Sequence, residues 1–352
     1  MRVALFFYLT FIIGLLQAQT KAPIYSNEFL SIGAGARGIA LGGAQASFGQ
    51  AEEGGYWNPA LLADVEAPYV SFMHSLYFGG VAAYDYASIA TQIDSVSGAS
   101  ITLIRLGVDD IPDTRLLYDA GGLIDYNRIS FFSAVDLAIL FSYGRKFEKW
   151  GGIQAGGSLK IIRRTAGNLA NAWGFGFDLG IKKDFPKGKL GLVLRDATST
   201  FNVWSHTVDL LEDVYQYTGN TLAENSTEIT LPSLTFGGAK LLFDRTNWKL
   251  MVMQDWKMTF DGKRNVLVSS NAFSLDPSIG GELNLKDVAF IRAGLNKIQK
   301  VEYGKNWRAE PAVGIGFKYS QILFNYAINR NNGFENHHYT HSFSLNWKLN
   351  KK

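Results

Sequence analysis

The feature that most constrains this chain is a period-two alternation of apolar and polar residues, repeated in about fourteen segments after residue 69. In the last segment, 339–350, one alternate set is Phe343, Leu345, Trp347 and Leu349, and the other is Ser342, Ser344, Asn346 and Lys348. The segments 153–161 and 173–182 repeat the pattern. Alternate side chains on a strand point to opposite faces, so each segment has one apolar, aromatic face and one polar or small face. A soluble β-sandwich could share this pattern.

The first residues have the layout of a signal peptide. Arg2 supplies a positive charge, residues 3–16 are almost entirely apolar, and Ala18 is a small residue at the expected cleavage point. The apolar run is too short to span a bilayer of ~30 Å comfortably, which disfavours a membrane anchor. We therefore expect cleavage near Ala18, export of the mature protein, and no membrane-spanning helix after the cleavage point.

Export combined with apolar, aromatic strand faces predicts an all-β fold: a transmembrane antiparallel β-barrel of about 14 strands with a polar lumen. The expected location is the outer membrane of a Gram-negative bacterium, with membrane lipid against the apolar face. The spacing of the breaks supports this prediction. Every second break is tight, as at 184–188, 244–247 and 285–287, and the long breaks fall in the other series. Short periplasmic turns and longer outer loops are typical of such barrels, and an even strand number places both barrel ends on the periplasmic side.

Composition agrees with this fold and excludes some functions. The chain is 47% hydrophobic and 14% aromatic, yet its mean hydropathy is near zero, as expected when apolar residues alternate with polar ones. It has no cysteine, which excludes a disulfide framework, thiol catalysis and thiolate metal sites. The net charge of +3 is spread out, so we expect no nucleic acid partner.

Residues 19–64 do not alternate and are rich in glycine and alanine. Asn58 can cap a short helical turn, and Pro59 suits the first position of that turn because no N–H is needed there. The apolar side chains of this segment need cover, which predicts a plug inside the barrel; a flexible periplasmic tail is the alternative. The expected organisation is a signal peptide at 1–18, a plug segment at 19–64 and a barrel at 65–352.

Two stretches carry a family resemblance. Phe29–Ala44 and Tyr56–Ala60 resemble the N-terminal signature of the PorV/PorQ family, which belongs with the FadL/OmpP1 group of outer-membrane barrels. The likeness continues more loosely through the later strands. Two features depart from the family: Glu52 and Glu53 stand where members often carry two aspartates, and the chain ends at 350–352 without the terminal aromatic residue common in barrels.

The resemblance implies a fourteen-stranded barrel with an N-terminal plug from a Bacteroidetes-like bacterium. It implies one of two functions: an accessory role in type IX protein secretion, or transport of hydrophobic molecules. We favour the secretion role, with a type IX translocon or a secreted cargo protein as partner. The aromatic and acidic loop 198–229 is then the expected docking surface. The alternative is a FadL-like channel whose partner is a hydrophobic small molecule.

The candidate plug residues are Gly33, Gly35, Arg37, Gly42, Gly43, Trp57, Asn58 and Pro59. The candidate lumen-facing residues are Lys160, Asp178, Lys182 and Arg195. These charged residues could steer the acidic head group of a ligand, or they could pair with one another and hold the barrel in shape. We favour pairing, because charges removed from water need partners.

No catalytic, cofactor or metal site is expected. Residues 33–38 match the G-x-G-x-x-G fingerprint, but that fingerprint binds a dinucleotide only within a strand–helix–strand unit, and no such unit is predicted here. The five histidines show no spaced serine or acid motif. The protein is therefore not expected to be an enzyme.

Overall fold

The computed structural model describes residues 26–119, 121–207, 226–300, 307–331 and 338–350. The predicted signal peptide therefore lies outside the described residues. Among those that are described, no helix is long and apolar enough to cross a membrane.

Strands account for most of the described chain. They are β1 (Tyr69–Tyr77), β2 (Ala82–Asp94), β3 (Ser97–Asp113), β4 (Ser130–Phe147), β5 (Ile153–Ala166), β6 (Ala170–Phe185), β7 (Gly188–Arg195), β8 (Thr200–His206), β9 (Thr227–Thr230), β10 (Ser233–Arg245), β11 (Trp248–Thr259), β12 (Val268–Ser269), β13 (Ser274–Leu285), β14 (Ala289–Lys300), β15 (Trp307–Tyr319), β16 (Ile322–Asn331) and β17 (His338–Lys348). The helices are short: η1 (Glu28–Ser31), α2 (Ala36–Ala40), η2 (Ala51–Glu53), α3 (Gly54–Trp57), η3 (Pro59–Asp64), η4 (Phe78–Gly80), η5 (Tyr126–Arg128) and η6 (Glu148–Trp150).

The strands form one closed antiparallel barrel. Neighbours pair around the sheet, and β17 pairs with β1 to close it. β7 and β8 pair with successive parts of β6 and act as one wall strand interrupted at 196–199. β9 and β10 are interrupted in the same way at 231–232, and β12 pairs only with the end of β13. The wall therefore has 14 strands, which confirms the predicted fold and the even strand number.

The alternation has the predicted consequence. On β17, Phe343 and Trp347 are 57% and 45% exposed, whereas Ser342 and Ser344, on the alternate positions, are only 0% and 7% exposed. Because the sheet is closed, the exposed face is the outside of the barrel and the buried face lines the lumen. In transmembrane barrels, an apolar outer face of this kind contacts membrane lipid.

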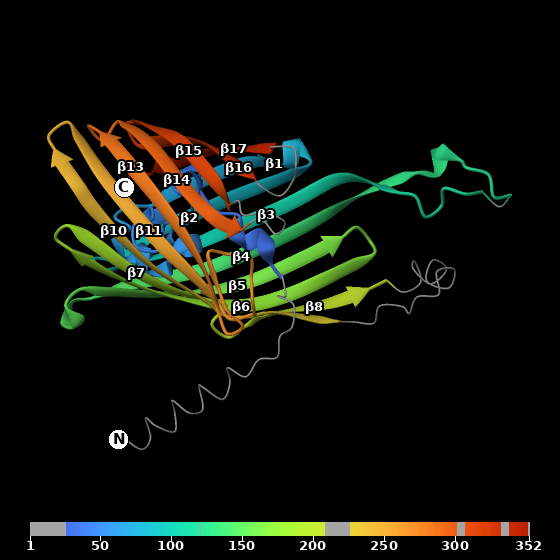
Figure 1. Cartoon of the computed structure of the whole chain (residues 1–352), viewed down its shortest axis with the longest axis horizontal. Coiled ribbons are helices and arrows are strands. Elements are labelled where there is room, and N and C mark those ends of the chain that lie inside the picture. Colours follow the sequence, from blue (N-terminus) through green and yellow to red (C-terminus); the bar gives the residue numbers. More distant parts are fainter. Residues whose placement is uncertain (1–25, 120, 208–225, 301–306, 332–337, 351–352) are drawn as a thin grey trace, which may run out of the picture.

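The two ends of the barrel differ. Tight turns, as at 186–187, join the strands at one end, and the longer connections project from the other (Figure 1). Tyr69 pairs with Lys348, so the barrel begins and ends at the tight-turn rim. The β3–β4 hairpin projects furthest, because β3 continues to Asp113 (Figure 1). The predicted loop 198–229 begins too early, because the wall continues in β8 after a backbone irregularity at 196–199. A similar irregularity at 109–110 interrupts β3 without ending it.

Residues 26–64, here called the N-terminal segment, lie inside the barrel and are mostly buried (Figure 1). Their hydrogen-bond partners come from strands all around the wall. The wall residues bonded to the segment include Ser88 on β2, Ser158 on β5, Asn202 on β8, Thr230 on β9, Asp255 on β11, Glu282 on β13 and Ser344 on β17. The segment therefore lies within the lumen and contacts strands on several sides of the wall.

Inward glycines make room for the segment. A Cβ atom at Gly191 would lie 2.0 Å from the carbonyl oxygen of Ala46, and one at Gly294 would lie 2.3 Å from the backbone nitrogen of Gly42. Distances this short are not tolerated between real atoms, so any side chain at these wall positions would displace the segment. Part of the high glycine content thus serves to bring the segment backbone against the wall.

Candidate functional site

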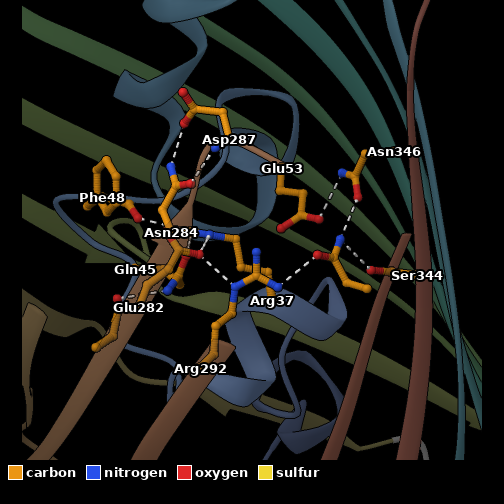
Figure 2. A network of polar contacts seen from close by, with 12 residues as sticks. Arg37, Gln45, Phe48, Glu53, Glu282, Asn284, Asp287, Arg292, Ser344 and Asn346 are labelled. Carbon is orange, nitrogen blue, oxygen red and sulfur yellow. Dashed lines mark hydrogen bonds and ion pairs between the residues drawn. The ribbon is translucent and has the colours of Figure 1, made fainter. Parts of the chain in front are cut away.

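An arginine in the first turn of α2 ties the N-terminal segment to the wall. Arg37 Nε lies 2.8 Å from Glu282 Oε2, and its Nη2 lies 3.1 Å from Glu282 Oε1, which gives a bidentate pair. Its Nη1 also donates to Gln45 Oε1 at 2.8 Å, and Arg292 Nε approaches Glu282 Oε2 at 2.6 Å. Figure 2 shows Arg37 between these partners. We call Arg37, Gln45, Glu282 and Arg292 the Arg37 cluster.

The Arg37 cluster is removed from water. The side chains of Arg37 and Glu282 are only 5% and 9% exposed. Burial opposes the charge of Arg37, but the Glu282 carboxylate outweighs this effect and holds the pKa of Arg37 above its ordinary value. The cluster therefore stays ionised, and removing either partner would leave a buried charge without compensation.

Two glutamates of η2 form a second buried contact. Asn346 Nδ2 donates to Glu52 Oε1 at 3.2 Å and to Glu53 Oε1 at 3.1 Å. Burial, and then the neighbouring charge of Glu52, raise the pKa of Glu53 to about 8. Burial also raises the pKa of Glu52. Glu53 is therefore largely protonated at neutral pH, which avoids two adjacent buried carboxylates.

An aromatic pair joins the two halves of the N-terminal segment. Tyr56 Oη donates to Leu30 O at 2.8 Å and accepts from Gly33 N at 2.9 Å, while Trp57 Nε1 donates to Ala34 O at 2.9 Å. A Cβ atom at Gly38 would lie 2.6 Å from the Trp57 ring. The two sequence motifs that carry the family resemblance thus pack directly against each other.

The predicted cap is present. Asn58 is the N-cap of η3, its Oδ1 accepts from Ala60 N at 3.0 Å, and Pro59 occupies the first helical position. The Asn58 amide also donates to Ala46 O at 2.6 Å and to Ile181 O on β6 at 3.3 Å. The sequence predicted the cap, but only the structure shows that Asn58 also joins the segment to the wall.

The remaining predicted plug residues are glycines with special backbone geometry. Gly33, Gly35, Gly42 and Gly43 all have positive φ angles. Gly35 precedes α2 at φ 72°, and Gly42 and Gly43 turn the chain after α2 at φ 65° and 80°. Only glycine adopts this region readily, so these residues set the path of the segment.

Three of the four predicted lumen-facing residues form ion pairs. Lys160 Nζ lies 2.8 Å from Asp178 Oδ1 and 2.5 Å from Asp196 Oδ1, and all three residues line the inner wall. Lys182 is 1% exposed, and its Nζ lies 2.6 Å from Asp64 Oδ2 of the N-terminal segment. Because these charges are paired within the protein, they are not free to attract the acidic head group of a ligand.

Arg195, the fourth predicted lumen-facing residue, contacts the N-terminal segment and borders a cavity. Arg195 Nη2 donates to Tyr56 O at 2.9 Å, and its guanidinium lies 4.9 Å from the centre of the Tyr56 ring. It also lines a cavity of about 570 Å³ between the N-terminal segment and the wall. We call this space the loop-side cavity, because strand ends next to the longer connections surround it.

The two sides of the loop-side cavity differ in chemistry. The segment contributes apolar side chains, including Leu30, Ile32, Ile39 and Trp57. The wall contributes charged side chains, including Arg195, Lys257, Asp276 and Glu310. The cavity can therefore hold an apolar group against the segment and a polar group against the wall.

Sequence reasoning missed Asp255, Lys257 and Asp276, three wall residues of this cavity. Their signal was present but weak: on β11, Asp255 and Lys257 alternate with the outward-directed Trp256. Asp255 Oδ2 accepts from the backbone nitrogens of Gln45 and Ala46 at 2.8 Å each, so it fixes the segment to β11.

A larger hollow of about 670 Å³ lies on the outward face. Exposed aromatic side chains such as Phe72, Phe317 and Phe343 surround it. It opens on the outer face of the barrel, and so it is separate from the lumen.

The comparisons with known proteins agree on the fold. No protein-family model matches the chain, and no curated protein matches it. The CymD monoaromatic hydrocarbon channel is similar in structure, with a TM-score of 0.61 and 13% identity over 91% of this chain and 98% of that one. The Ralstonia pickettii toluene transporter TbuX gives a TM-score of 0.55 and 12% identity over 90% and 99%. A Pseudomonas aeruginosa FadL homologue gives 0.56 and 10% over 90% and 98%. At these identities the likeness shows a shared barrel fold.

Proposed function

We propose that this protein is an outer-membrane channel for small hydrophobic molecules and that its N-terminal segment acts as a plug. The observation that carries the proposal is the loop-side cavity: the segment lies within the lumen but leaves a space of about 570 Å³ at the loop end, with apolar side chains as its floor. A solute that enters between the outer loops meets the plug at this point.

The fold supports the same function. The similar solved structures include proteins described as a monoaromatic hydrocarbon channel and a toluene transporter. The alternation of exposed aromatic residues and buried polar residues suits a wall with lipid outside. We place the protein in the outer membrane of a Gram-negative bacterium, with cleavage near Ala18 as a further expectation.

Passage requires the plug to shift. Asp255, Glu282 and Ser344 hold the N-terminal segment at separate points of the wall. A channel gated by this segment opens only when some of these contacts break, because the segment backbone touches the inner wall. Lys160 and Lys182 then serve mainly to hold the barrel and the segment in shape.

The alternative is an accessory role in type IX secretion, with a translocon or a secreted cargo protein as partner. It is supported by the resemblance of Phe29–Ala44 and Tyr56–Ala60 to the PorV/PorQ family. Most of the docking loop expected for it, 198–229, lies outside the described residues. We place the channel first because the cavity and the fold both support it.

A disulfide across the plug tests the proposal. The chain has no cysteine, so Ala36→Cys with Ser344→Cys gives a single possible link, at a site where Ala36 N lies 3.1 Å from Ser344 Oγ. The matched control is Ser75→Cys with Ser342→Cys, whose side chains meet at 2.6 Å within the wall. Toluene flux into liposomes should fall for the oxidised plug link, recover on reduction, and remain unchanged for the wall link.

Equal flux for the oxidised plug link and the wall link would refute a gating plug.

A deletion strain separates the two functions. Loss of hydrophobic-solute uptake with an intact profile of secreted proteins supports the channel. Secreted proteins retained in the periplasm, with uptake unchanged, would support the secretion role.

A further inference from the structure

Two opposite charges face the loop-side cavity without forming a pair. Lys257 on β11 and Asp276 on β13 are directly opposed in the strand register. Side chains so placed have Cβ atoms about 5 Å apart, close enough for an ion pair. Nevertheless, in the part of the chain that the structure describes, the Lys257 side chain makes no hydrogen bond or ion pair. The Oδ1 atom of Asp276 is buried and has no hydrogen-bond partner there.

Three neighbouring basic residues are already engaged. Arg195 donates to Tyr56 O, and Lys297 Nζ lies 2.9 Å from Glu310 Oε2. Arg264 Nη2 lies 2.5 Å from Asp261 Oδ2. On the wall of the cavity, Lys257 and Asp276 therefore lie side by side as one donor and one acceptor, and the Glu28 carboxylate of the N-terminal segment lines the same space.

We infer that the loop-side cavity binds a small zwitterion with an apolar side group, the chemistry of a hydrophobic α-amino acid. A ligand carboxylate accepts from the Lys257 ammonium, and a ligand ammonium donates to Asp276. The apolar side group lies against Ile39 and Trp57 of the N-terminal segment. This inference rests on the proposed function and deepens it, because it gives the cavity a preference, among solutes with an apolar group, for those that also carry an ammonium and a carboxylate.

The arrangement discriminates between close analogues. A neutral aromatic hydrocarbon fits the apolar side but leaves Lys257 and Asp276 without partners. An acid or an amine satisfies only one of the two. A site built to bond both groups rejects an analogue that lacks one, because the buried group left behind stays unpaired.

Four probes of one shape test the inference by calorimetry on the purified, detergent-solubilised barrel. They are L-phenylalanine with both charged groups, 3-phenylpropionate with the acid alone, 2-phenylethylamine with the amine alone, and ethylbenzene with neither. We expect L-phenylalanine to bind about tenfold or more tighter than each of the other three, since each of them lacks at least one charged hydrogen bond.

Two variants should separate the two ends of the ligand. Lys257→Met should weaken L-phenylalanine and 3-phenylpropionate about tenfold and leave 2-phenylethylamine unchanged. Asp276→Asn should weaken L-phenylalanine and 2-phenylethylamine and leave 3-phenylpropionate unchanged. Lys257→Arg should restore L-phenylalanine binding. Retained mobility of the unboiled barrel in electrophoresis shows that each variant is folded.

The outcomes are distinguishable. Ethylbenzene binding as tight as L-phenylalanine would overturn the zwitterion inference and leave the channel intact. Equal weakening of all four probes by Lys257→Met would assign that residue a structural role and also overturn the inference. Failure of every probe to bind, together with absent toluene flux, would overturn the proposed function itself.

Discussion

The members of the Arg37 cluster should differ in how much each contributes to the free energy of unfolding. Glu282 is the only acid among the cluster's charged side chains and contacts both Arg37 and Arg292. Arg37→Met leaves Glu282 paired with Arg292 at 2.6 Å, so we expect a loss of unfolding free energy near the lower end for a broken buried pair, about 3 kcal/mol. Glu282→Gln leaves two buried guanidinium groups without an anion, and we expect a loss of about 5 kcal/mol.

Equilibrium unfolding of the barrel in detergent micelles by guanidinium chloride, followed by tryptophan fluorescence, measures both losses. The control is Arg145→Met, which breaks a pair with Asp94 whose side chains are 42% and 44% exposed. Exposed pairs contribute little to stability because water and salt screen them, so the control should change little. A loss for Glu282→Gln that is equal to or smaller than the loss for Arg37→Met would refute the assignment of Glu282 as the shared anion.

Three further predictions concern the outer face, the buried acids and the inner glycines. Leu159 is 47% exposed at an outward position in the middle of β5, so Leu159→Arg should reduce folding stability in liposomes by about 2–4 kcal/mol. Phe185→Arg, at the rim, should reduce it by less than about 1 kcal/mol. Similar losses for the two variants would place the membrane elsewhere. Because the folded state raises the pKa of Glu53 from 4.5 to about 8, the contribution of Glu53 to stability is full below pH 4.5 and is lost as the pH rises through 8. Glu53→Gln should therefore flatten the plot of melting temperature against pH between these values. An unchanged slope would contradict the raised pKa of Glu53. Gly294→Ala should expose the N-terminal segment to protease while the barrel stays resistant, and Gly281→Ala, which has no atom within 4 Å of the added Cβ, should not.

The wall was predictable from the sequence because strand alternation is a local property. The period of two on β5, β6 and β17 identifies strands, assigns their faces, and requires only that one face be covered. The tight turns were equally local, since residues such as those at 184–188 favour turns whatever surrounds them. The prediction erred where β7 meets β8, because the irregularity at 196–199 resembles a strand end in sequence, although the wall continues to His206.

The contacts inside the lumen were not predictable in the same way. Asn58 as a cap follows from its neighbours, but its bond to Ile181 joins residues 123 positions apart. Arg37 was identified as a plug residue, yet its partner Glu282 lies 245 positions away. No local pattern distinguishes Glu282 from other polar residues on inward strand positions.

The sequence by itself determined the strands, their faces, their even number and the cap at Asn58, because these follow from backbone geometry and from the chemistry of adjacent residues. Only the tertiary structure decided that Arg37 meets Glu282, that Lys182 meets Asp64, and that Lys257 and Asp276 face a cavity unpaired. Closing the barrel brings strands that are distant in sequence around one segment. A charge buried there is removed from water, so it is stable only when one of these strands provides an oppositely charged partner.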